Sequence, residues 1–298
     1  MVDPAAALGP DDNRARVVTC EPPLLVFGGP YSNLRALTAL RERAHTLGVA
    51  PANVICTGDV VAYCAEPEET TQAMRDWGCH VVAGNCEEQL AQAAEDCACG
   101  FAPGSACDVL AKGWYPFANA RLSPASRAWM AALPKALTFD LGGTRFRVIH
   151  GGVDAINRFV FASERETIAE ELARGDADVI IAGHCGIPFA RNIGQRVWFN
   201  PGVIGMPAND GTSDVWYGLV HVEQGDLVLS THRLAYDHIG AAAALRRSGH
   251  ADGYARTLIT GVWPSLDILP AAERAATGRR LAPRTLRVRL RAPAAAAE

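Results

Sequence analysis

The sequence of 298 residues lacks long hydrophobic runs and clusters of basic residues. No stretch reaches the roughly 18 consecutive apolar residues that a membrane-spanning helix needs, and the first residues contain no apolar segment typical of a secretion signal. Lys and Arg total 28 against 32 Asp and Glu, so the net charge is only -4. These absences argue against a membrane partner and disfavour nucleic acid as a partner. We therefore expect a soluble globular protein of the cytoplasm.

Cysteine, by contrast, is abundant. The chain has nine cysteines, an odd number. In a reducing compartment, clustered cysteines bind metal or take part in chemistry more often than they form disulfides. The cysteines are therefore candidate ligands, with packing as small buried hydrophobic side chains as the alternative.

Short apolar runs that end at Gly, Asp, Asn or His predict a series of buried strands. These runs lie at 24–29, 53–59, 80–85, 145–152, 178–184 and 197–202. Helical patterns separate some of them, at 33–47, 66–77 and 163–174. A hairpin is expected at 218–231, which would make the sheet mixed. The alternation predicts a layered α/β fold with functional groups at the carboxyl ends of the strands.

Composition divides the chain into a main domain and flanking segments. Residues 1–20 and 290–298 are rich in Pro and Ala, and we expect both to be disordered. Between them we expect a main domain at 21–240 and a C-terminal helical appendage at 241–289. Residues 91–138 interrupt the alternation with a cysteine-rich stretch and then helical sequence, which predicts a helical cap over the strand ends.

Four dipeptides close successive apolar runs, namely Gly58-Asp59, Gly84-Asn85, His150-Gly151 and Gly183-His184. Around them stand longer motifs: Gly58-Asp59-Val60-Val61-Ala62-Tyr63-Cys64, Gly84-Asn85-Cys86-Glu87, Gly183-His184-Cys185-Gly186 and Asn200-Pro201-Gly202-Val203-Ile204-Gly205-Met206-Pro207. In the order and residue types of these motifs, over roughly residues 24–240, the chain resembles the calcineurin-like metallophosphoesterases of the compact bacterial and archaeal type. The resemblance implies a metallophosphoesterase-like four-layer α/β sandwich, in which mixed sheets are flanked by helices, with a helical insertion.

The resemblance also implies a changed metal site. In that family two metal ions share one Asp and otherwise have separate ligands. One full set of ligand positions is present here, as Asp59, Asn85, His150 and His184. The separate ligand positions of the other ion hold different residues, Gly29, Tyr31 and Gly186. Because the losses remove one site and leave its neighbour whole, the resemblance implies a modified centre rather than random decay.

A carboxylate, a carboxamide and two imidazoles form a mixed oxygen and nitrogen set that suits Zn, Mn or Fe(II). Such a set leaves coordination positions open. A divalent ion with open positions can polarise a phosphoryl oxygen or lower the pKa of bound water towards about 7. The leading hypothesis is therefore a metal-dependent hydrolase, most plausibly a phosphoesterase, that acts on a small anionic substrate.

Several cysteines and one tyrosine widen the set of candidate ligands. Cys86 stands where the family places a histidine general acid, which makes it a candidate catalytic residue and a candidate ligand. Cys185 follows His184 directly, and Cys64 lies five residues beyond Asp59. Tyr31 occupies a ligand position and could bind through its phenolate, with filling of the vacated space as the alternative. A possible second thiolate group has the spacing C-x-C-x7-C, at Cys97, Cys99 and Cys107.

These thiols support two other hypotheses. A thiolate-rich zinc or iron centre, or an iron–sulfur cluster, would favour redox or sulfur chemistry that involves Cys86 and Cys185. A non-catalytic ligand sensor on a phosphoesterase scaffold is the third possibility. The sequence indicates no oligomeric state.

Overall fold

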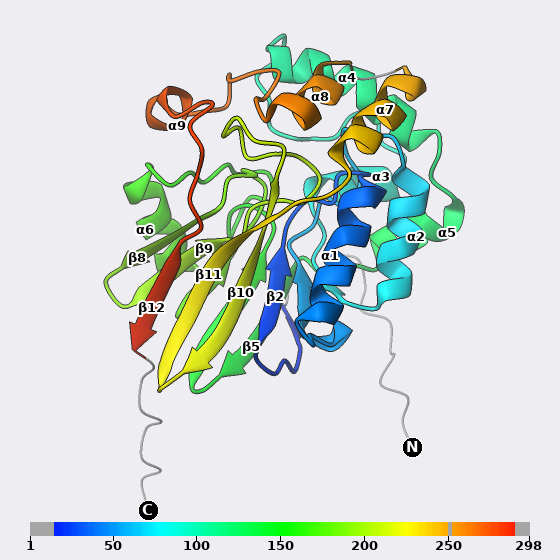
Figure 1. Ribbon diagram of the computed structural model, residues 1–298. Helices are drawn as coiled ribbons and strands as arrows, with labels where there is room; N and C mark the ends of the chain where they lie inside the picture. Colours follow the sequence, from blue (N-terminus) through cyan, green and yellow to red (C-terminus); the bar gives the residue numbers. More distant parts are fainter. Residues whose placement is uncertain (1–14, 250–251, 290–298) are drawn as a thin grey trace, which may run out of the picture.

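Two six-stranded sheets form the centre of the protein (Figure 1). The computed structural model describes residues 15–249 and 252–289. The first sheet has the order β1 (Arg16–Val17), β5 (Ala136–Leu141), β6 (Thr144–Ile149), β7 (Val179–Ile181), β9 (Arg196–Asn200) and β8 (Phe189–Ile193). The second has the order β12 (Thr285–Arg289), β11 (Asp226–Leu234), β10 (Val215–Glu223), β2 (Leu24–Phe27), β3 (Val54–Cys56) and β4 (His80–Val81). Both sheets are mixed, since each contains parallel and antiparallel pairs.

Alternate residues of the central strands enter two different hydrophobic layers. In β2, Leu24 and Val26 pack between the two sheets, whereas Leu25 and Phe27 pack against the helices outside. β7 divides its residues in the same way in the other sheet. Because successive side chains of a strand point to opposite faces, a strand covered on both faces becomes a continuous apolar run. This explains why the sequence shows these strands so clearly.

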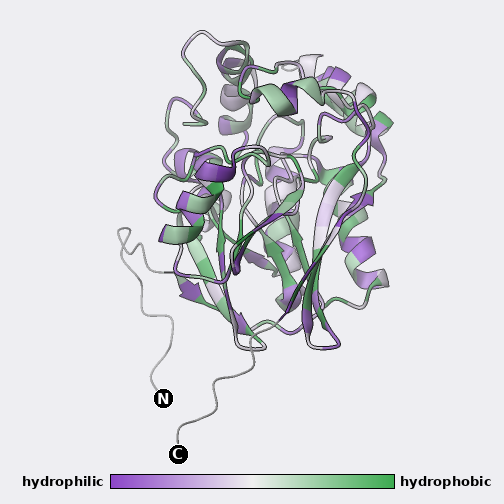
Figure 2. Ribbon diagram, turned by 90° about the vertical axis from the view of Figure 1, so that its left-hand side faces the viewer, coloured by the Kyte–Doolittle hydropathy of each residue, from purple (hydrophilic) through white to green (hydrophobic). Residues whose placement is uncertain are grey.

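Helices cover the outer face of each sheet. On the second sheet lie α1 (Leu34–Thr46) and α2 (Pro67–Trp77), and on the first lies α6 (Arg165–Arg174). Ile168 and Leu172 of α6 pack on the first sheet, and Leu37, Leu40 and Met74 pack on the second. In Figure 2 the hydrophobic colour concentrates on the strands, while the helices also carry hydrophilic colour. The order helix, sheet, sheet, helix confirms the predicted four-layer sandwich.

Further helices lie over the end of the sandwich to which β2 points (Figure 1). They are α4 (Ala106–Asn119), α7 (His238–Ser248), α8 (Asp252–Thr260) and α9 (Ala271–Ala275). Elsewhere, α3 (Asn85–Ala91) follows β4, α5 (Pro124–Ala131) lies beside α2 and α3, and a 3₁₀ turn at Pro51–Asn53 precedes β3 at the opposite end. Tyr63 joins this layer to the core, because its ring contacts Trp114 of α4 and Tyr254 of α8, with centroids 5.2 and 4.6 Å away. None of the helices in the described ranges is long and apolar enough to cross a membrane.

The expected strands and helices are confirmed, and so is the hairpin, which is formed by β10 and β11. The predicted insertion at 91–138 contains α4 and α5 and extends into β5. The segment expected as a helical appendage also contributes β12, which pairs antiparallel with β11. β12 is a short edge strand whose sequence, TLRVR, alternates polar and apolar residues without a continuous apolar run. Of the predicted leader only residues 15–20 are described, and they include β1; the predicted tail at 290–298 lies outside the described residues. The domain boundaries stay predictions.

The carboxylate of Glu68 joins α2 to the start of α5. It accepts hydrogen bonds from the backbone N–H of Ser123 at 2.9 Å, and from the hydroxyls of Ser123 and Ser126 at 2.7 and 3.0 Å. Burial would raise the pKa of Glu68, but these donors outweigh it and lower the pKa below the ordinary value. The stabilisation is therefore present above the pKa of the unfolded chain and is lost as the pH falls through the lower pKa of the folded state.

We expect Glu68→Gln to lower the free energy of unfolding by about 1–2 kcal/mol at neutral pH, because hydrogen bonds to a charged acceptor are lost. The difference from the parent protein should shrink in acid. Urea denaturation at neutral pH and at about pH 4, near the ordinary pKa of glutamate, measures both effects. Glu69→Gln, at an exposed neighbouring position on α2, is the matched control. An equal loss in both variants would contradict this role for Glu68.

Candidate metal centre

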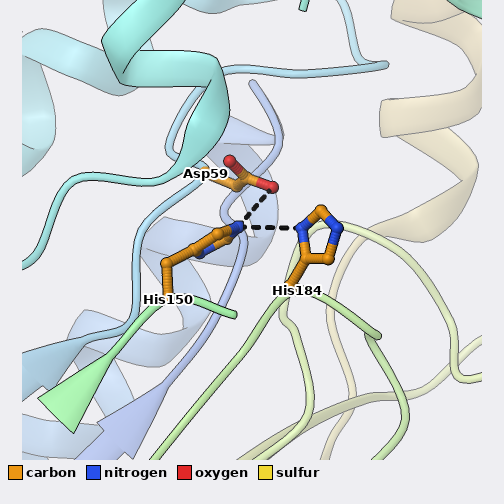
Figure 3. Close-up of side chains that lie close together, drawn as sticks. All are labelled: Asp59, His150 and His184. Carbon is orange, nitrogen blue, oxygen red and sulfur yellow. Dashed lines mark hydrogen bonds and ion pairs between the residues drawn. The ribbon is translucent and has the colours of Figure 1, made fainter. Parts of the chain in front are cut away.

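The four predicted ligands come from loops that follow four different strands. Asp59 follows β3 and Asn85 opens α3 after β4, whereas His150 and His184 follow β6 and β7 of the other sheet. Among the described residues, Asp59, His150 and His184 are the group of His, Cys, Asp or Glu side chains whose donor atoms all lie within 4.8 Å of one another. Figure 3 shows these three side chains pointing toward one another. The carboxyl ends of strands from both sheets therefore meet at one point.

Nε2 of His150 lies at the centre of this group. It is 3.2 Å from Oδ2 of Asp59, 3.1 Å from Oδ1 of Asn85 and 3.0 Å from Nδ1 of His184. All four side chains are buried, and His184 is the most exposed at 9%. The structure thus brings together the whole predicted set.

Hydrogen bonds outside the centre orient two of the side chains. The other ring nitrogen of His150, Nδ1, lies 2.6 Å from the carbonyl oxygen of Thr57, which can only accept. Nδ1 must therefore carry a proton, so the neutral ring keeps its lone pair on Nε2, at the centre. The amide nitrogen of Asn85 donates to the carbonyl of Cys97 at 2.9 Å, which turns Oδ1 toward His150.

The local backbone is held in conformations that few residues adopt. Asp59 and His184 have φ values of 56° and 60°, in the left-handed region. Gly58 has no side chain at the point where two loops meet, and a Cβ there would lie 2.6 Å from N of Gly84 and 2.9 Å from Nδ1 of His150. Non-glycine residues in this region cost about 1–3 kcal/mol and are typical of functional sites.

Glu87 is a buried acid that holds the loops of Asp59 and Gly84 together. Its carboxylate accepts from the backbone N–H groups of Asp59, Val60 and Gly84 at 2.7, 2.8 and 2.8 Å. Its position in the first turn of a helix would by itself suggest only a favourable interaction with the helix dipole. Burial and the nearby Asp59 raise the pKa of Glu87 to about 7, against the effect of these donors. The sequence signal for this role is weak, since only the fold brings the two loops together.

The electrostatics of the group favour a cation. Burial would raise the pKa of Asp59, but His150 and His184 outweigh it, so the pKa is lowered. Burial would lower the pKa of His150, but Asp59 outweighs it, so the pKa is raised. Burial and the adjacent His150 lower the pKa of His184 to about 3, so its ring is neutral, as a metal ligand requires.

The donor set fits a divalent transition metal. A carboxylate oxygen, an amide oxygen and two imidazole nitrogens converge, and such a mixed oxygen and nitrogen set suits a divalent ion. Nδ1 of His184 faces this group, 3.0 Å from Nε2 of His150. The side chains of Asp59, Asn85, His150 and His184 are therefore the residues that would hold the ion.

Comparison with known proteins shows the family to which the chain belongs. Residues 32–225 match the family model of the calcineurin-like phosphoesterase superfamily domain. The chain belongs to the calcineurin-like phosphoesterase superfamily. A metallophosphoesterase from Sphaerobacter thermophilus is similar in structure, with a TM-score of 0.63 and 20% sequence identity, over 84% of this chain and 100% of that one. A hypothetical protein from Pyrococcus horikoshii has a TM-score of 0.69 and 16% identity, over 81% of this chain and 99% of that one. A search of the curated proteins found no match.

Among calcineurin-like phosphoesterases this chain departs at the first motif. The ring of Tyr31 packs directly over Gly29, so a Cβ at Gly29 would clash with the ring. Tyr31 is 4% exposed, and burial and Asp59 raise the pKa of its phenol well above the ordinary value. The structure therefore favours a neutral space-filling tyrosine over a phenolate ligand.

The three cysteines predicted as ligands, Cys64, Cys86 and Cys185, are not part of the group formed by Asp59, His150 and His184. The thiol of Cys64 points to the carbonyl of Gly205 at 3.7 Å, and that of Cys185 to the carbonyl of Ile187 at 3.7 Å. Cys86 lies nearer, because its thiol is hydrogen-bonded to the carboxylate of Asp59. Burial raises the pKa of each of these thiols, that of Cys185 to about 12. They are neutral thiols in the structure, and adjacency in sequence did not predict their directions.

The possible second thiolate group is not assembled. Cys97 and Cys99 form a disulfide, and sulfurs in a disulfide cannot act as thiolate ligands. Within the described ranges, no group of three cysteines has sulfur atoms within 4.8 Å of one another. The structure therefore gives no support to the possible second thiolate group at Cys97, Cys99 and Cys107, which stays a prediction.

Because Glu87 positions two ligand-bearing loops, we expect Glu87→Gln to weaken metal binding about 10–100-fold, as loss of a supporting hydrogen bond does in other metal sites. The glutamine NH₂ would face backbone N–H groups that need an acceptor. Isothermal titration of Mn²⁺ or Zn²⁺ measures the effect. Glu88→Gln, which alters only an ion pair with Lys135 at the surface, is the control. Equal affinities in the two variants would count against a positioning role.

We expect metal affinity to fall in acid, because the ion must displace the proton from Nε2 of His150. The raised pKa of His150 means that protonation competes from near neutral pH downward. Below that pKa the affinity should drop about tenfold per pH unit. Titration of Zn²⁺ at several pH values, with circular dichroism to confirm folding, checks the slope. A flat profile through this range would show that His150 is not a ligand.

Proposed function

We propose that the protein is a metal-dependent phosphoesterase whose centre is formed by Asp59, Asn85, His150 and His184. Membership of the calcineurin-like superfamily supports this class of reaction. The observation that carries the proposal is the arrangement around Nε2 of His150, where two oxygens and a nitrogen lie within 3.2 Å. Fe, Mn and Zn all suit this donor set.

A divalent ion bound there would act as a Lewis acid on a phosphoryl oxygen and lower the pKa of a bound water. The chain's own residues supply orientation and shielding. Thr57 fixes the ring of His150. The ring of Phe159 lies against that of His184, with centroids 4.2 Å apart, and keeps water from one side of His184. In this proposal Cys86 holds the carboxylate of Asp59 through its thiol, and its raised pKa makes it a weak acid.

We further propose that the centre holds one ion rather than two. The positions of the second ion's ligands hold Gly29, Tyr31 and Gly186, and the Tyr31 ring blocks any side chain at Gly29. Metal analysis should therefore find one tightly bound ion per chain. A non-catalytic sensor is the second candidate, and the same packing of Tyr31 favours it because a two-ion clamp is absent.

We expect Asp59→Asn and His184→Ala to reduce hydrolysis of an aryl phosphate more than about 100-fold, beyond what loss of a supporting residue costs. Assays with Mn²⁺, Zn²⁺ and anaerobic Fe²⁺ measure turnover. His45→Ala, at an exposed histidine on α1, is the control and should keep full activity.

The outcomes separate the hypotheses. One bound ion without turnover under any of these metals would favour the sensor, and acid-labile sulfide in the anaerobic protein would favour an iron–sulfur centre. Turnover that survives Asp59→Asn would overturn the proposed centre.

A further inference from the structure

A pocket with a cavity volume of about 70 Å³ adjoins the candidate centre. Loops at the strand ends form one side of it, and α4, α8 and the segment 263–268 form the other. We refer to it as the aromatic pocket.

The aromatic pocket reaches the centre through Asp59 and His184, which are both among its lining residues. Asp59 is 4% exposed and His184 is 9% exposed. A molecule in the pocket would therefore have one end beside the atoms that would hold the ion. The rest of that molecule would contact the pocket walls.

Aromatic rings supply much of these walls. Tyr63 contacts Tyr31 and Tyr254 on one side, with centroids 4.8 and 4.6 Å away. Phe101 and Phe159 stack 6.2 Å apart and line the same pocket. These rings present flat apolar surfaces, which prefer stacked or edge-on contacts with another ring.

Trp263 contributes a further ring to the wall. Its N–H donates to the carbonyl of Pro207 at 2.6 Å, so the indole's polar atom is already satisfied. It therefore has no hydrogen to donate to a ligand and offers the pocket an apolar surface.

Positive charge is missing from the pocket walls. Among the described residues that line it, none is Lys or Arg. The arginines that follow the two histidine motifs are engaged elsewhere: Arg158 pairs with Glu171 at 2.7 Å, and Arg191 donates to the carbonyl of Ala162 at 2.9 Å. A second negative charge on a ligand would therefore enter the pocket without a counter-ion, at a large desolvation cost.

We propose that the aromatic pocket binds an uncharged aromatic group attached to the phosphoryl group that reaches the metal centre. The substrate class would be an aryl, or similarly flat apolar, phosphoester whose single anionic group is the one at the ion. Compounds with a second charged group, such as nucleoside polyphosphates, are disfavoured. The proposal deepens the proposed function and rests on it only for the position of the phosphoryl end.

Binding of non-hydrolysable phosphonates to the metal-loaded protein tests this proposal without any need for turnover. Phenylphosphonate and methylphosphonate carry the same anionic group and differ in the ring. We expect phenylphosphonate to bind at least about tenfold more tightly, since even one methylene in an apolar pocket is worth that much. A phenylphosphonate with a para carboxylate should bind more weakly than one with a para methyl group. Isothermal titration measures all four.

Two tryptophan variants on α4 form a matched pair. Leu110 lines the pocket, and Leu110→Trp should fill it and remove the preference for phenylphosphonate. Val109, the preceding residue, is 60% exposed and does not line it, so Val109→Trp should keep the preference. Circular dichroism and retained metal binding show whether each variant is folded.

Equal binding of phenylphosphonate and methylphosphonate by the unaltered protein would overturn the proposal, and so would failure of both to bind. An equal loss in the two tryptophan variants would also overturn it. Selective binding of phenylphosphonate without hydrolysis of any aryl phosphate would instead support the pocket and contradict the proposed catalytic function.

Discussion

The candidate centre depends on one constraint, the direction of the lone pair on Nε2 of His150. The carbonyl of Thr57 requires a proton on Nδ1, so the neutral ring directs its lone pair toward oxygens of Asp59 and Asn85 and toward His184. A positive charge placed among these four buried polar atoms would be stabilised by them. A proton can supply this positive charge, which explains the raised pKa of His150. One proton, however, bridges only two acceptor atoms at a time. A metal ion can interact with all four atoms at once. The geometry that is strained without an ion therefore gives the centre affinity for a cation.

Short-range contacts around the centre, and not the hydrophobic core, hold this geometry. Glu87 bridges the loops of Asp59 and Gly84 through backbone hydrogen bonds. Gly58 allows these loops to touch, and a side chain there would collide with Gly84 and His150. The left-handed backbone conformations of Asp59 and His184 are strained, and such contacts are needed to stabilise them. Glu87 joins two loops of the second sheet, and the close approach of Gly58 to His150 joins that sheet to the first.

The fold class could be predicted from the sequence because buried strands follow simple rules, whereas the four donor residues were implied by the resemblance of their motifs to the family. Strands buried on both faces are continuous apolar runs, and residues after parallel strands meet at one edge. The thiols were beyond these rules, since Cys185 follows His184 directly yet points to Ile187. β12 was missed because an edge strand needs no apolar run. The aromatic pocket combines Tyr31, α4 and α8, which are distant in sequence, so no local pattern could indicate it.

Tyr31 links the loss of one ion position to the gain of an apolar wall. Its ring covers Gly29, and its Cβ lies so close to Gly205 that a side chain at either glycine would clash. The two glycines and the tyrosine therefore form one packing unit, and a carboxylate cannot return at Gly29 while the ring stays. The same ring lines the aromatic pocket beside Asp59. In the proposed one-ion centre this unit stands in place of two metal ligands and adds apolar surface, so it would favour ligands with one anionic group and a flat apolar body over multiply charged phosphates.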